Sequence, residues 1–177
     1  MSSFPKICKA LAGHDKALLI ALIAEMHALS PQNRDFLDAR FLTDGAALER
    51  YKRTIKLALF PDIDDPVSFR DARKAISDYR KAIGQDAGVA EPLVYAAECG
   101  NQFTCDYGDI DGPFYDALIR MFASAVKAVK KLDRREAGPF VGRLAAVVKK
   151  SDCIGWGYHD CIADEFADAF PELDGVA

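Results

Sequence analysis

PFYDALIRMFASAVKAVKKLD, residues 113–133, is the stretch that decides the fold. Its large apolar residues return every three or four positions, which places them on one face of an α-helix. A half-buried strand would alternate apolar and polar residues, and no segment of the sequence does so over more than a few positions. We therefore expect an all-α protein. The apolar stripe of this helix comprises Phe114, Leu118, Met121, Phe122, Ala125, Val129 and Leu132.

The same spacing recurs on both sides of this stretch, between residues that typically begin or end helices. Ser30 and Ser68 are each placed to cap a following helix, and Gly84 stands where a helix commonly ends. A turn is expected at residues 136–138. The apolar run Ala17–Ala24 is too short to span a bilayer and is expected to be a buried helix segment. The pattern predicts seven to nine helices in a compact antiparallel bundle or a short array of helical hairpins.

The bulk composition is that of one globular domain. The chain has 177 residues, half of them hydrophobic, and a formal net charge of −4. We expect a single domain over residues 1–177, with residues 1–13 and 171–177 as peripheral ends. The first residues lack the charged and apolar regions of a secretion signal, so a cytoplasmic location without membrane insertion is expected. Neither a phosphate-binding loop nor a dinucleotide-binding fingerprint occurs, and we expect no cofactor and no catalytic residue.

The cysteines give no sign of a metal or redox motif. They are odd in number, scattered, and never in the C-x-x-C spacing that zinc and redox sites favour. We expect reduced and mostly buried thiols. The five are Cys8, Cys99, Cys105, Cys153 and Cys161.

Three short segments stand out together in chain order. They are residues 35–41 (DFLDARF) followed by Tyr51-Lys52 and Leu59-Phe60-Pro61, Glu98-Cys99-Gly100 with residues 107–111 (YGDID), and residues 154–160 (IGWGYHD). In this order they resemble a bacterial family described only as a helical domain of unknown function. The resemblance extends from about residue 15 to about residue 170. It implies a helical fold and supplies no activity.

Acidic and aromatic residues gather at two glycine-rich breaks, Gly108–Gly112 and Gly155–His159. Converging carboxylates with an imidazole suit a divalent metal, and an aromatic pair beside a histidine suits a small-molecule pocket. The spacing matches no complete metal motif. The structural alternatives are aspartates that cap a helix and a tryptophan that fills a gap between helices. The candidate residues are Glu98, Tyr107, Asp109, Asp111, Trp156, His159 and Asp160.

Basic residues suggest a second kind of surface. They either form a partner-binding face or complement the acidic C-terminal helix inside the molecule. Arg40 in particular is expected to pair with a carboxylate. The acidic total disfavours nucleic acid as a partner. The candidate residues are Arg40, Lys52, Arg73, Lys131 and Arg135.

The sequence favours a non-catalytic helical interaction or scaffold protein, with a protein partner that it does not identify, because packing stripes dominate and no catalytic spacing occurs. The alternative is a small-molecule or divalent-metal-binding protein, with an enzyme included in that class. Its site would lie between the two glycine-rich breaks.

Overall fold

The computed structural model describes residues 3–42, 45–84 and 87–171, and this part of the chain is helical without any strand. The expected all-α fold with seven to nine helices is confirmed, with nine α-helices among the described residues. In chain order they are α1 (Phe4–Leu11), α2 (Lys16–Leu29), α3 (Pro31–Phe41), α4 (Ala46–Leu59), α5 (Phe69–Ile83), a short 3-10 turn η1 (Ala87–Val89), α6 (Ala90–Tyr107), α7 (Gly112–Val129), α8 (Arg134–Lys150) and α9 (Tyr158–Ala169).

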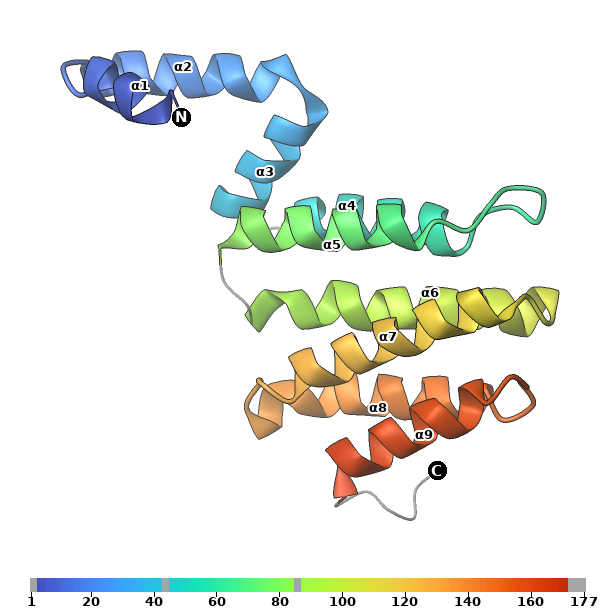
Figure 1. Cartoon of the computed structure of the whole chain (residues 1–177). Helices are drawn as coiled ribbons and strands as arrows, with labels where there is room; N and C mark the ends of the chain where they lie inside the picture. The colour runs from blue at the N-terminus through green and yellow to red at the C-terminus, as the bar shows by residue number, and fades with distance from the viewer. Residues whose placement is uncertain (1–2, 43–44, 85–86, 172–177) are drawn as a thin grey trace.

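Three successive helical hairpins, α4 with α5, α6 with α7, and α8 with α9, stack on one another (Figure 1). Helix α6 lies at the centre and contacts α4, α7 and α8. Gly100 lets α6 approach α7 closely, since a Cβ atom at this position would lie 2.5 Å from Cδ1 of Leu118. The apolar stripe of residues 113–133 therefore packs in the core, as expected, and Leu118 and Phe122 are fully buried.

Local capping chemistry sets several of the helix ends. The Oγ atoms of Ser30 and Ser68 accept hydrogen bonds from the backbone N–H groups of Asn33 at 3.1 Å and Asp71 at 3.2 Å. Gly84 ends α5 with a φ of +68°, in the left-handed region that favours glycine. These three expectations are confirmed.

The prediction of a turn at residues 136–138 is wrong, because these residues lie inside α8. The side chain of Asp133 caps α8 earlier, accepting from the backbone N–H groups of Arg135 at 3.0 Å and Glu136 at 2.9 Å. Pro139 sits in the second turn, where its missing N–H removes a single helical hydrogen bond.

The first three helices depart most from the expected bundle. Figure 1 shows α1 and α2 at one end of the molecule, connected to the stacked hairpins through α3. Helix α2 makes its main contacts with α3. None of the described residues 3–42 is buried. The expectation that Ala17–Ala24 is a buried segment is therefore wrong, because the contacts of α2 with α3 cover only one side of the helix and bury none of its residues.

The cysteines are free, but they are not mostly buried as expected. Cys99 is buried, while Cys8, Cys105, Cys153 and Cys161 are exposed. A single thiol carries little apolar area, so it does not decide which side of a helix faces the core. Among the described residues, no helix is both long and apolar enough to cross a membrane.

Candidate functional site

The two glycine-rich breaks lie next to each other in space, and Trp156 of the second break contacts the first. Its ring stacks on that of Tyr115 with 6.2 Å between centroids, and a Cβ atom at Gly112 would lie 3.8 Å from the indole. Trp156 does not fill a gap between helices, since it is 61% exposed. Its φ of +62° lies in the left-handed region, which is costly for a residue with a large side chain.

Both aspartates of the first break accept hydrogen bonds from residues in the first turn of α7. Oδ1 of Asp111 accepts from the backbone N–H of Phe114 at 2.8 Å, so the capping interpretation of Asp111 is confirmed. Asp109 accepts a long hydrogen bond from the Tyr115 hydroxyl at 3.4 Å. Within residues 3–42, 45–84 and 87–171, no group of three or more His, Cys, Asp or Glu side chains is arranged to hold a metal ion.

The other residues of the predicted acidic and aromatic site lie elsewhere. Tyr107 packs its ring on Phe103 with 4.9 Å between centroids. Glu98 faces α8 and pairs with Arg143. Asp160 is exposed in the first turn of α9.

His159 joins the turn that follows α8. Its Nδ1 lies 3.0 Å from Oγ of Ser151, a fully buried hydroxyl that itself donates to the carbonyl of Val148 at 2.7 Å. A serine hydroxyl has one hydrogen, so Nδ1 of His159 is the donor in this contact. Nε2 of His159 lies 3.8 Å from Asp152, so both ring nitrogens contact the turn that follows α8.

The predicted basic residues are spread over five elements. Lys52 is engaged internally, with its Nζ 3.1 Å from Glu91 and 3.2 Å from Glu49. Arg73 lines a hollow of about 370 Å³ between α5, α6 and α7. Lys131 lines another of about 540 Å³ between α7 and α9, together with Glu165. Arg135 is exposed at the start of α8.

Arg40 was expected to pair with a carboxylate, and among the described residues it does not do so. Its guanidinium donates to the carbonyl oxygens of Ala82 and, at 2.7 Å, of Lys81. These carbonyls belong to the last turn of α5, which has no further helical donors and favours positive charge. Arg40 therefore holds α3 to the C-terminal end of α5, and Gly84 leaves the space for its guanidinium.

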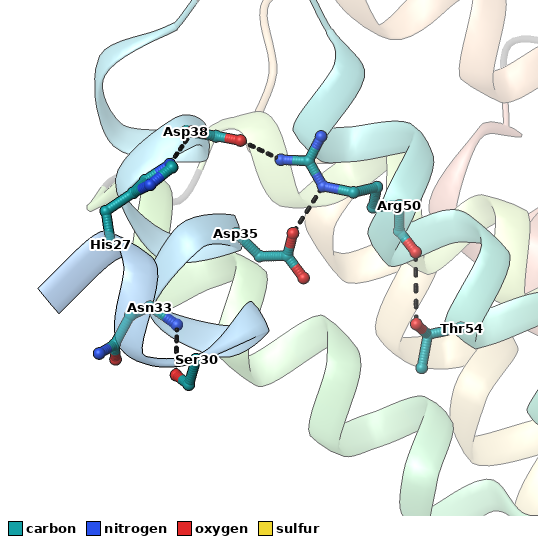
Figure 2. Close-up of polar contacts among 7 residues, drawn as sticks. All are labelled: His27, Ser30, Asn33, Asp35, Asp38, Arg50 and Thr54. Carbon is teal, nitrogen blue, oxygen red and sulfur yellow. Dashed lines mark hydrogen bonds and ion pairs between the residues drawn. The ribbon is translucent and has the colours of Figure 1, made fainter. Parts of the chain in front are cut away.

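A second arginine, Arg50, holds α3 against α4. Figure 2 shows Arg50 reaching from α4 to Asp35 and Asp38, with N···O distances of 2.5 Å to each. On its other side, Asp38 lies 3.4 Å from Nε2 of His27 in α2. The contacts thus run from α4 through α3 to α2, and they orient the first helices relative to the body.

Replacing Arg50 with glutamine is expected to loosen this junction without unfolding the body. Two ion pairs with half-buried aspartates are lost, so we expect amide hydrogen exchange in α3 to become roughly tenfold faster. Hydrogen exchange followed by mass spectrometry measures this change. Arg53→Gln, one turn further along the exposed side of α4, is the control. Equal exchange rates in both variants would show that Arg50 does not hold α3.

Helices α1 and α2 (residues 4–29), named here the N-terminal arm, carry an unusual amount of apolar surface. Eight of the sixteen large apolar side chains that are exposed in the described chain lie on these two helices. They are Phe4, Ile7, Leu18, Ile20, Leu22, Ile23, Met26 and Leu29. Exposed apolar side chains concentrated on two successive helices commonly mark an interaction site.

A pocket of about 390 Å³ lies between α4, α6 and α8. It falls within the size range of small-molecule sites. Its wall combines apolar side chains with three cations and one carboxylate. The lining residues are Lys56, Phe60, Glu98, Cys99, Asn101, Gln102, Arg143, Ala146, Val147 and Lys150.

An ion-pair network forms one wall of this pocket. Arg143 donates to both carboxylate oxygens of Glu98 at 2.7 Å and to Glu91 at 2.5 Å. Glu91 also lies 3.1 Å from Lys52. Burial alone would raise the pKa of Glu91, but hydrogen bonds from Arg143 and Lys52 lower that pKa overall. The network therefore holds the Glu91 carboxyl in its charged form.

Periodicity could not have identified this pocket, because its groups come from helices far apart in sequence. Arg143 lies 45 positions from Glu98 and 52 from Glu91. The available signal was the position of Glu91 and Glu98 seven residues apart, which places them on one face of α6.

Comparisons with protein-family models, with curated proteins and with solved structures find no match to this chain.

Proposed function

We propose that this chain is a helical interaction protein whose N-terminal arm pairs with the arm of a second copy. The observation that carries the proposal is that α2 is apolar around its whole circumference and yet has no buried residue. Helices of this composition normally lie in a protein interior. Leaving so much apolar surface in water is unfavourable, and association removes it from water.

The contacts of α2 indicate which side is open. Leu19 and His27, its two half-buried residues, lie close together on the helical wheel and mark the side that is partly covered by the protein itself. The opposite side carries a stripe of small residues flanked by large ones, a surface that lets another helix approach closely. The small residues are Ala17, Ala21, Ala24 and Ala28, and the flanking leucines are Leu18, Leu22 and Leu29.

Size and charge favour a second copy as the occupant. The arm spans residues 4–29, close to the ~20–30 residues that each partner contributes to a standard interface. Helix α2 carries formal charges only at Lys16 and Glu25, so two identical faces meet with little repulsion. A two-fold arrangement would bury the same face of α2 in both copies, as closed homodimers do.

The double substitution Leu18→Glu with Leu22→Lys is expected to convert a dimer to a monomer. The two new side chains face the same way and form a favourable i,i+4 pair, so α2 stays helical while its leucines are lost from the interface. Light scattering after size exclusion should give twice 19.4 kDa for the wild type and 19.4 kDa for the variant.

Leu57→Lys provides the matched control, since Leu57 is 68% exposed on α4 and lies outside the arm. It should leave the dimer intact. A wild-type mass of 19.4 kDa at every protein concentration, or a dimer that survives the double substitution, would contradict the proposed pairing.

A further inference from the structure

We propose that the pocket between α4, α6 and α8 binds a small organic anion, with a carboxylate or phosphate head group and an apolar body. This inference is independent of pairing through the N-terminal arm. The proposed small-molecule site is lined by residues of α4, α6 and α8. The sequence had suggested a small-molecule site between the two glycine-rich breaks.

The charge around the pocket is positive. Lys56, Arg143 and Lys150 contribute three positive charges and Glu98 one negative charge, which leaves two positive charges in excess. Neither Lys56 nor Lys150 forms an ion pair with another described residue, and both are exposed at the surface. In a protein with a net charge of −4, two exposed lysines that have no ion-pair partner among the described residues favour an anionic ligand.

Arg143 is held in place before any ligand arrives. Glu98 and Glu91 engage three of its five N–H groups, which leaves two for a ligand. An anchored guanidinium loses little side-chain entropy on binding. Both oxygens of Glu98 are occupied by Arg143, so this carboxylate repels an incoming anion less than a free one would.

Part of the pocket wall suits an apolar group. It is formed by Phe60, Val147 and Cys99, of which Val147 and Cys99 are buried. Burial raises the pKa of the Cys99 thiol to about 11, so this thiol is neutral at physiological pH and contributes an apolar surface. A ligand can therefore place its charged head group at Lys56 and Lys150 and its apolar body against these apolar side chains.

Asn101 adds a buried polar side chain to the pocket wall. It is 1% exposed and accepts from the hydroxyl of Tyr158 at 3.0 Å. Its amide N–H group contacts Sγ of Cys105 at 3.6 Å, and sulfur is a weak acceptor. A ligand oxygen is a stronger acceptor for this donor.

Phenyl phosphate and benzoate are suitable probes, with inorganic phosphate as the comparison that lacks an apolar body. Titration of isotope-labelled protein, followed by NMR, should give saturable shifts at the backbone amides of Ala146 and Val147. The double substitution Lys56→Gln with Lys150→Gln should weaken binding of phenyl phosphate on the order of tenfold, because two surface ion pairs are lost. The matched control is Arg53→Gln with Lys149→Gln, which removes two neighbouring exposed cations outside the pocket.

Three results would overturn the proposal. They are no saturable binding of phenyl phosphate or benzoate, equal affinity for inorganic phosphate and phenyl phosphate, and an equal loss of binding in the control variant. The Leu18→Glu, Leu22→Lys variant should bind the probes like the wild type. Failure of pairing through the arm and failure of this anion site are therefore separate outcomes.

Discussion

Arg143→Met is expected to lower the free energy of unfolding by about 2 kcal/mol, because it leaves Glu91 and Glu98 facing each other without their shared cation. Breaking a fully buried ion pair costs roughly 3–5 kcal/mol. We expect less here because the side chains of Arg143, Glu91 and Glu98 retain 31%, 23% and 32% exposure. Denaturant unfolding followed by circular dichroism measures the change.

The loss of stability in Arg143→Met should depend on pH. The pKa of Glu91 is lowered in the folded protein, so its contribution to stability is present above its ordinary value of 4.5 and is lost as the pH falls through the lower folded value. Without Arg143 this stabilisation of the carboxylate is weakened. The difference in stability between wild type and variant should therefore narrow in acid.

Two further variants separate the effect of the ion-pair network from other effects of the substitution. The first is a triple variant that combines Arg143→Met with Glu91→Gln and Glu98→Gln. It should recover most of the lost stability, because no unpaired carboxylate remains. Arg70→Met, at a side chain that is 90% exposed, should change stability by less than about 0.5 kcal/mol. A triple variant as unstable as Arg143→Met would show that the cost comes from packing of the arginine stem.

Features that depend on a few neighbouring residues could be predicted from the sequence. Ser30, Ser68 and Asp111 each cap a helix through an N–H group three residues away. The stripe through Leu118 identified the inward face of α7, because the 3.6-residue period is a property of the helix itself. The fold class followed from these local patterns.

Features that depend on which helices meet could not be predicted in the same way. The run Ala17–Ala24 has the composition of a buried helix, but composition does not say whether the covering surface belongs to the same chain. Arg40 was expected to meet a carboxylate, yet it donates to carbonyls in the last turn of α5, 41 and 42 residues away. The location of the candidate small-molecule site was not predicted either, because it also depends on which helices meet. Glu98 faces α8 and not the glycine-rich breaks.

Gly100→Val is expected to destabilise the protein by about 3 kcal/mol, at the upper end of what overpacking a core costs. The first added carbon would lie 2.5 Å from Cδ1 of Leu118, and Leu118 is fully buried. The two helices α6 and α7 must then separate or Leu118 must leave its preferred rotamer. Thermal and denaturant unfolding measure the loss.

Gly142→Val, on the exposed side of α8, is the matched control for this substitution. A Cβ atom there meets nothing within 4 Å, so only helix propensity changes, and stability should stay within about 0.5 kcal/mol of the wild type. Leu118→Ala should in turn relieve the crowding, so Gly100→Val should cost much less in that background than in the wild type. Additive effects of the two substitutions would contradict direct contact between residue 100 and Leu118, and with it the close approach of α6 and α7 on which the core depends.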